Sequence, residues 1–221
     1  MTKHIEEMMM LIHEMAGSHS EYTVFADWLN MYAISTRNAC SLVQGKVYRQ
    51  HEQEFTAIKE KYKDDRFGDL SGLFVLELER EPRDVLGELF MTAGYGSKMG
   101  GQFFTPRSVQ QAMAALEFRP EWKNSSGAIN LHEPTIGSAG MIIEMCNPMR
   151  GNGINYQKRL RVVGQDLDWR CIHMSYVQLS YLGVDAVIAQ GDTLTDPYVP
   201  GTPDFPPQRI WRTPRNAGVL I

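Results

Sequence analysis

The stretch from residue 127 to residue 192 alternates between short apolar runs and helical patterns, and this alternation constrains the fold more than any other feature. The predicted strands are GAINLHE, LRVVGQD and VDAVIAQGD, and the predicted helices lie in GSAGMIIEM, after its glycine turn, and in WRCIHMSYVQLSYL. The order strand, helix, strand, helix, strand predicts an α/β protein with a parallel sheet covered by helices. In such a sheet, ligands bind at the carboxyl ends of the strands.

The part of the chain before this alternation predicts helices that pack on helices. Apolar side chains repeat at i, i+3, i+4 and i+7 in one segment, and a second segment continues the pattern. These side chains are Phe25, Trp28, Leu29 and Tyr32 in the first segment and Phe55, Ile58 and Tyr62 in the second. The stretch EPRDVLGELFMTAG, residues 81–94, adds a helix with a proline suited to its first turn.

A glycine-rich stretch from Gly94 to Gly101 predicts a flexible joint between two domains. We expect a helical domain over residues 1–99 and an α/β domain over residues 100–221. Directly after the joint, Thr105 and Pro106 are suited to the N-cap and the first position of a further helix. Val109, Met113 and Leu116 lie on one face of that helix.

The charge is distributed unevenly along the 221 residues. Residues 1–99 carry 11 Lys and Arg against 16 Asp and Glu, whereas residues 100–221 carry 11 against 10, so the acidic excess lies in the first part. Arg209, Arg212 and Arg215 follow the last acidic residue, Asp204. Basic clusters can neutralise phosphates and release counterions, so these three arginines are candidate nucleic-acid contacts. A solvated surface is the alternative interpretation.

Composition argues against several classes of protein. Three cysteines, Cys40, Cys146 and Cys171, form no close pair, and the six histidines show no metal-ligand spacing, so neither disulfides nor a metal site is expected. The apolar run of residues 8–12 is too short to span a bilayer, and the acidic start lacks the basic region of a signal peptide. We therefore expect a cytoplasmic protein without membrane contact.

The carboxyl ends of the three predicted strands carry acidic residues and glycines. The first strand ends in Glu133 and runs into a turn with Gly137 and Gly140, the second ends in Asp166, and the third is followed by Asp192. An acid at the end of the second strand can accept hydrogen bonds from ribose hydroxyls, and glycines let the backbone approach a ligand closely. This ordered series predicts a nucleoside pocket.

The order of four motifs, GQFFTP, EPTIGSAG, GQD and GDTL, behind a helical part resembles the methylation subunit of type I restriction-modification systems and related adenine-amino DNA methyltransferases. This resemblance implies a Rossmann-like class I methyltransferase sheet that uses S-adenosylmethionine to methylate adenine in DNA. It also implies a separate specificity or restriction subunit as a partner.

The resemblance also implies roles for individual residues. The first motif would close over S-adenosylmethionine, the acid-and-glycine motif would lie under the methionine part, and the later acids would meet the ribose and the adenine. Carried over in that order, the residues are Phe104, Thr105 and Pro106, then Glu133, Gly137 and Gly140, then Asp166, and finally Asp192.

The sequence departs from the family pattern in its chemistry. The family usually reads Asp-Pro-Ala-Cys-Gly-Ser-Gly-Gly where this chain has EPTIGSAG, so Ala139 replaces a glycine and its methyl group is expected to crowd the turn. The target-base motif, Asn-Pro-Pro followed by Phe or Tyr, is missing. That motif accepts the protons of the adenine amine and stacks on a flipped base.

Two stretches are candidates for the missing motif. TDPY supplies Asp196 and Tyr198, and DFPP supplies Asp204 and Phe205. After Gly191 the sheet is expected to be truncated, with only NAGVLI, residues 216–221, adding a short strand. Two alternatives therefore stay open: a catalytically inactive relative that binds S-adenosylmethionine, DNA or a partner, and a nicotinamide-dependent oxidoreductase.

Overall fold

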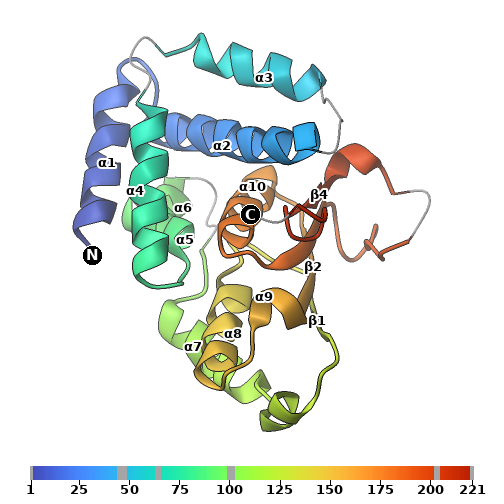
Figure 1. The fold of residues 1–221 in the computed structure, drawn as a ribbon. Helices are drawn as coiled ribbons and strands as arrows, with labels where there is room; N and C mark the ends of the chain where they lie inside the picture. The colour runs from blue at the N-terminus through green and yellow to red at the C-terminus, as the bar shows by residue number, and fades with distance from the viewer. Residues whose placement is uncertain (1, 44–48, 63–65, 99–102, 202–204, 220–221) are drawn as a thin grey trace. The chain divides into compact units, whose positions relative to one another are not determined.

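The computed structural model describes residues 2–43, 49–62, 66–98, 103–201 and 205–219, without the side chains of residues 43, 97 and 98. The chain forms two compact units (Figure 1). The first consists of Met1–Glu81 with Val85–Phe103, and the second consists of Pro82–Asp84 with Phe104–Ile221. The short segment Pro82–Asp84 therefore belongs to the second unit, although both of its chain neighbours belong to the first.

The described part of the first unit is helical. Its helices are α1 (Lys3–Ala16), α2 (Glu21–Val43), α3 (Arg49–Lys59), α4 (Phe67–Arg80), α5 (Val85–Thr92) and α6 (Tyr95–Lys98). The predicted stripe on α2 packs inside this unit, because Phe25, Trp28 and Leu29 are fully buried. The Trp28 indole also donates a hydrogen bond to Ser71 Oγ at 3.0 Å. The prediction of a helical amino-terminal part is confirmed.

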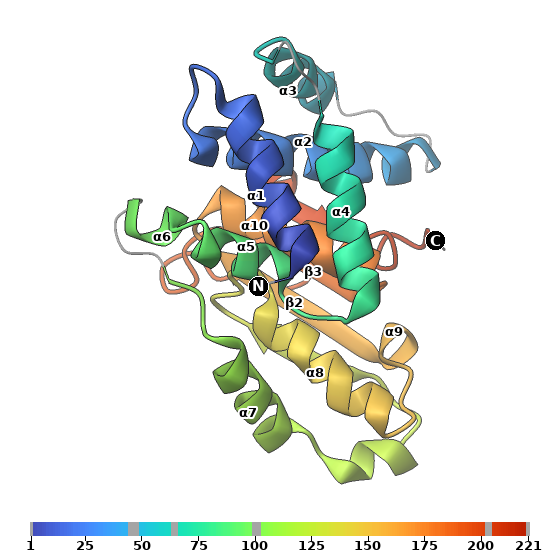
Figure 2. The same ribbon diagram turned by 90° about the vertical axis from the view of Figure 1, so that its left-hand side faces the viewer.

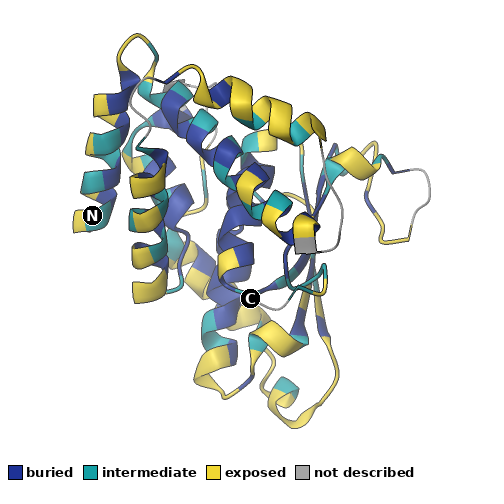
Figure 3. Ribbon diagram, turned by 45° about the horizontal axis from the view of Figure 1, so that its top comes forward, coloured by how far each residue is buried: buried dark blue, intermediate teal, exposed yellow. Residues whose placement is uncertain are grey.

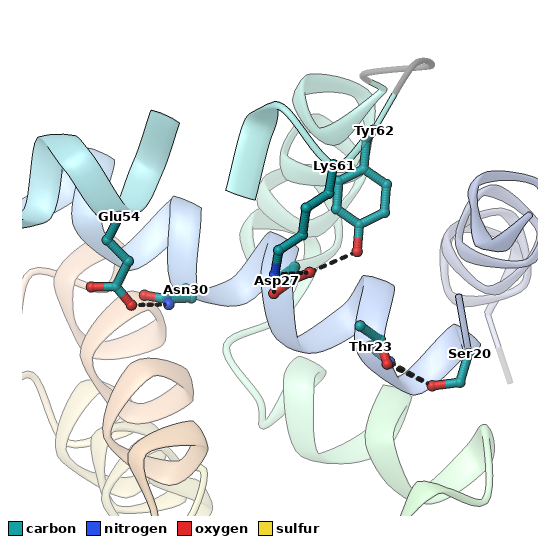
Figure 4. Close-up of polar contacts among 7 residues, drawn as sticks. All are labelled: Ser20, Thr23, Asp27, Asn30, Glu54, Lys61 and Tyr62. Carbon is teal, nitrogen blue, oxygen red and sulfur yellow. Dashed lines mark hydrogen bonds and ion pairs between the residues drawn. The ribbon is translucent and has the colours of Figure 1, made fainter. Parts of the chain in front are cut away.

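Polar contacts join α2 to α3 and to the residues that follow α3 (Figure 4). Asn30 donates to Glu54 at 2.7 Å, and Asp27 accepts a hydrogen bond from the Tyr62 hydroxyl at 2.8 Å and pairs with Lys61 at 3.2 Å. Burial, followed by the hydrogen bond to Asp27, raises the pKa of Tyr62. On α3 only Ile58 is buried, so the helix is mostly exposed (Figure 3).

The second unit contains a four-stranded sheet in the order β1-β2-β3-β4. Its strands are β1 (Ile129–Glu133), β2 (Leu160–Asp166), β3 (Asp185–Gln190) and β4 (Ile210–Arg212). The first three strands are parallel, with Leu131 opposite Val162 and Val162 opposite Ala186, whereas β4 is antiparallel to β3. Parallel strands bring their carboxyl ends to one edge, which places the loops after β1, β2 and β3 together.

Helices and short 3-10 turns complete the second unit. They are α7 (Arg107–Glu117), η1 (Pro120–Asn124), α8 (Gly140–Gly151), α9 (Tyr156–Arg159), α10 (Trp169–Tyr181) and η2 (Pro207–Arg209). α10 packs against β2, β3 and β4 and is buried from Cys171 to Ser180, while α7 packs against α8 (Figure 2). The predicted α/β fold behind a helical part is therefore confirmed.

Several local predictions are wrong. The last strand of the sheet lies at Ile210–Arg212, whereas residues 216–218 form a turn and residues 220–221 lie outside the described residues. α7 begins at Arg107 without a side-chain cap from Thr105. Within the predicted joint, Tyr95–Lys98 form helix α6, and residues 99–101 lie outside the described residues.

The apolar face of α7 is also not its packing face. Val109, Met113 and Leu116 are exposed, whereas Gln110 and Ala114 are buried. A polar residue replaces an apolar one in this contact because the Gln110 side chain fills a space beside a glycine of α8, as described below. Among the described residues, no helix is both long and apolar enough to cross a bilayer.

Candidate functional site

The turn between β1 and α8 has an unusual backbone. Gly137 has φ 54° and Ala139 has φ 73°, so two residues of the turn are left-handed. The left-handed region costs a residue with a Cβ atom roughly 1–2 kcal/mol, so the substitution of Ala for Gly at position 139 leaves a strained residue. The Ala139 methyl group is fully buried. Neighbouring contacts must therefore offset the conformational cost of Ala139.

Asp166 joins the end of β2 to this turn. Its Oδ2 atom accepts a hydrogen bond from the Gly137 backbone N–H at 2.9 Å, and its Oδ1 atom accepts one from the Asp168 N–H at 3.0 Å. The neighbouring Gln165 carbonyl accepts from the Ile136 N–H at 2.9 Å. Each carboxylate oxygen can accept more than one hydrogen bond, so Asp166 keeps acceptor capacity for a ligand.

The segment before α7 reaches the same turn. A Cβ atom at Gly137 would lie 3.3 Å from two carbon atoms of the Phe104 ring, so this ring lies against the glycine. Gln110 donates to the Thr105 carbonyl at 2.8 Å, and its amide occupies the place of a Cβ atom on Gly140. Sequence reasoning missed Gln110, for which a polar residue between apolar positions gave only a weak signal.

The other two acidic residues at this edge, Glu133 and Asp192, accept hydrogen bonds within their own loops. Glu133 is partly buried and accepts hydrogen bonds from the Thr135 N–H at 3.3 Å and hydroxyl at 3.4 Å. Asp192 accepts from the Leu194 N–H at 2.9 Å. Hydrogen bonds, first from this N–H and then from the Thr195 side chain, lower the pKa of Asp192, so it is ionised at neutral pH. The Thr193 hydroxyl donates to the Pro134 carbonyl and so connects the loops after β1 and β3.

The candidate target-base residues lie elsewhere. Tyr198 and Phe205 are 3% and 5% exposed, and they pack against each other and against Val187 and Ala189 of β3. Asp196 forms an ion pair with Arg209 at 2.9 Å, and Asp204 lies outside the described residues. The structure therefore does not bring the two aromatic rings to the glycine turn.

A buried glutamine fixes the loop that carries two of these candidates. Gln165 is fully buried in β2, and its amide donates to the Asp196 carbonyl and accepts from the Tyr198 N–H, both at 2.8 Å. The sequence pattern predicts a role only for the acid of the GQD motif. The glutamine before the acid has a separate function, because it ties the loop after β3 to the middle of the sheet.

The three candidate nucleic-acid arginines differ in their surroundings. Arg209 donates to the Gln190 carbonyl at 2.6 Å, pairs with Asp196 and lies 4.6 Å from the centre of the Phe205 ring. Although no acidic residue follows Asp204 in the sequence, the fold thus pairs Arg209 with an acidic residue that precedes it. Arg212 is exposed and donates to Asn216, and Arg215 is partly exposed and donates to the Gln157 carbonyl.

The cysteines are buried, and burial raises the pKa of the Cys146 thiol to about 12. A thiol with such a pKa carries almost no thiolate at neutral pH and is a poor nucleophile. In the part of the chain that the structure describes, no group of three or more His, Cys, Asp and Glu side chains could hold a metal ion.

The parallel sheet, the glycine turn after β1 and the acid at the end of β2 define a class I methyltransferase-like α/β unit. The family model for N-6 DNA methylases matches residues 83–206, which is more than half of the chain. The chain belongs to the N-6 DNA methylase family. This result confirms the resemblance seen in the sequence, and S-adenosylmethionine is the methyl donor of this class of enzyme.

Solved structures similar to the chain include the following two. One is a Listeria monocytogenes protein assigned as a class I S-adenosylmethionine-dependent methyltransferase, with 16% identity, a TM-score of 0.48, and coverage of 89% of this chain and 56% of that one. The other is the type I restriction-modification methyltransferase subunit of Streptococcus thermophilus, with 19% identity, a TM-score of 0.41, and coverage of 71% and 31%. No curated protein sequence matches significantly. The chain thus spans about half of the first structure and a third of the second.

Proposed function

We propose that this chain binds S-adenosylmethionine at the carboxyl ends of β1, β2 and β3 and takes part in adenine-amino methylation of DNA. The hydrogen bond between Asp166 and the Gly137 N–H carries the proposal, because it joins the acid of the second strand to the glycine turn of the first. Phe104 lies against the same glycine and adds an apolar wall. Membership of the N-6 DNA methylase family supports the choice of cofactor and reaction class.

The residues present fit such a ligand. Gly137 and Ala139 in left-handed conformation open the backbone before α8, and Asp166 has acceptor capacity beyond its two backbone partners. In the proposed site Asp166 accepts the ribose hydroxyls, Asp192 accepts from the adenine amine, and Glu133 faces the methionine part. Thr105 and Pro106 place Phe104 as a cover. S-adenosylmethionine supplies an electrophilic methyl group on a sulfonium ion.

A thermal and calorimetric titration tests the binding site. At a concentration of S-adenosylmethionine about a hundredfold above its Kd, the chain should gain roughly 2.7 kcal/mol of stability, because a ligand that binds only the folded state shifts the unfolding equilibrium. NADH at the same concentration is the control and should give no shift. The absence of both a melting shift and heat at millimolar S-adenosylmethionine would overturn the proposal.

A second function is favoured by the burial of Tyr198 and Phe205. Rings packed against β3 are not free to stack on a flipped adenine, and the sequence has no Asn-Pro-Pro motif. We therefore propose that the isolated chain binds the cofactor but transfers the methyl group poorly. In this view it acts with DNA and with a separate specificity or restriction subunit.

DNA contact should depend on Arg212 and Arg215 but not on Arg209. Replacing Arg212 and Arg215 with Gln should weaken duplex binding for all sequences alike and reduce the salt slope by about 2, since each phosphate contact contributes about 0.9. Arg209→Gln should instead lower stability, because Arg209 holds Gln190 and Asp196. Filter binding across a salt series measures both. An unchanged slope in the double variant would remove this surface from the proposal.

A further inference from the structure

A segment far from the glycine turn in sequence forms part of its support. Pro82–Asp84 lies between α4 and α5 but belongs to the second unit. Arg83 and Asp84 are buried, and the Asn147 side chain on α8 donates to the Pro82 carbonyl at 3.2 Å. The segment is therefore held by α8, the helix that follows the glycine turn.

Asp84 contacts the turn directly through Ser138 and indirectly through Gln178. The Ser138 hydroxyl donates to Asp84 Oδ2, and the Gln178 amide of α10 donates to Asp84 Oδ1 at 2.9 Å. The same Gln178 amide donates to the Ser138 carbonyl at 2.6 Å. Asp84, Ser138 and Gln178 are all buried, so the three residues form a hydrogen-bond network away from water. Hydrogen bonds to a charged acceptor in such a place are stronger than ordinary ones.

Because Ser138 lies within the glycine turn, this network holds the backbone of the turn. Ser138 lies between Gly137 and Ala139, the two left-handed residues, and Ala139 carries a conformational cost. Asp84 and Gln178 hold both the hydroxyl and the carbonyl of Ser138, whereas Asp166 holds the N–H of Gly137. The turn is thus fixed from two independent elements, one at the end of β2 and one before α5.

We propose that Asp84 is a positioning residue for cofactor binding, which acts through Ser138 and Gln178 to keep the turn in its left-handed conformation. The inference rests on the proposed binding of S-adenosylmethionine. Because energetic coupling between two sites is reciprocal, bound cofactor should in turn stabilise the segment 82–84. Cofactor binding would then be linked to the connection between α4 and α5.

Calorimetry with S-adenosylmethionine tests the inference on four variants of the full chain. Asp84→Ala and Ser138→Ala should each raise the Kd about tenfold, the factor that corresponds to the loss of a hydrogen bond to a charged group. The double variant should be no weaker than about the worse single one, since contacting residues in one network are not additive. Ser138→Ala removes only a hydroxyl and serves where Asp84→Ala does not fold.

Thr213→Val is the matched control. Thr213 is fully buried, and its hydroxyl donates to the Val184 and Ala186 carbonyls at 2.7 and 3.2 Å and accepts from the Ala186 N–H at 3.0 Å. These hydrogen bonds are to β3 and the residue before it, not to the turn. It should lower the melting temperature without changing the Kd. Hydrogen exchange of peptides that cover residues 82–84 should slow when S-adenosylmethionine is added to the native chain, a readout that does not depend on activity.

The outcomes separate the two proposals. If the native chain binds S-adenosylmethionine and the Asp84 and Ser138 variants bind it equally well, the cofactor site stands and the role of Asp84 is wrong. Equal weakening by Thr213→Val would assign the effect to general stability and would also overturn that role. If the native chain gives neither binding heat nor a melting shift with S-adenosylmethionine, the proposed function fails and the inference fails with it.

Discussion

The isolated chain should methylate adenine on the order of a hundredfold to a thousandfold more slowly for each amine hydrogen bond that it cannot make. Cofactor contacts hold the methyl donor but do not stabilise the amine, whose protons need acceptors in the transition state. In this chain the Asn-Pro-Pro motif is absent, and the Tyr198 and Phe205 rings are packed against β3. Stacking on a flipped base is therefore lost as well.

The assay uses labelled S-adenosylmethionine with duplex, mismatched and single-stranded oligonucleotides, since the last two lower the cost of flipping a base. Methyladenine formed at about one turnover per second, which is within the ordinary range of enzymes, would contradict the prediction. In that case Asp196→Ala and Asp204→Ala identify the loop that accepts the amine protons. Asp196→Ala also breaks the ion pair with Arg209, so its melting temperature must be measured in parallel.

Replacing Asp166 with Ala should raise the Kd for S-adenosylmethionine about a hundredfold, which corresponds to about 2.7 kcal/mol. The carboxylate accepts the N–H groups of Gly137 and Asp168 and is the proposed acceptor for the ribose. Without the Asp166 carboxylate, the turn loses its hydrogen bond from the Gly137 N–H, and the ribose hydroxyls lose their proposed charged acceptor. Hydrogen bonds to charged groups contribute about 1.5–3 kcal/mol each, so the estimate requires the loss of one or two.

Asp185→Ala is the matched control for this substitution. Asp185 begins β3, at the opposite end of the strands, and accepts a hydrogen bond from Asn216 at 2.6 Å. Its replacement should lower stability without changing the Kd. Titration calorimetry on both variants measures the difference. A Kd for Asp166→Ala within about twofold of the native value would show that the ribose does not bind here.

The local sequence was sufficient to predict the three parallel strands and the residues at their carboxyl ends. Val162 and Ile188 lie in apolar runs that form neighbouring parallel strands, and the acids and glycines that follow the strands meet at one edge. These features depend on periodicity and on the geometry of parallel strands, which residues close in sequence determine. The order of the four motifs likewise predicted the N-6 DNA methylase family, whose model matches residues 83–206.

Local patterns failed where a distant partner decides the outcome. The apolar spacing of Val109, Met113 and Leu116 predicts a helix correctly, but the space beside Gly140 decides that Gln110 faces α8. The short strand at Ile210–Arg212 forms because it pairs with β3 across a long loop. The residues next to Gln110 do not predict its contact with α8, and the residues next to Ile210–Arg212 do not predict the pairing of this strand with β3.

The sequence by itself thus determined the α/β class, the three parallel strands and the residues available at their carboxyl ends, because these follow from short-range pattern and strand direction. Only the tertiary structure decided which residues far apart in the sequence come into contact. Asp84 and Ser138 are 54 positions apart, and Asp84 and Gln178 are 94 apart, yet they share one buried network. The stability of such contacts comes from hydrogen bonds, strengthened by the low local dielectric, between elements that the chain brings together only when it is folded.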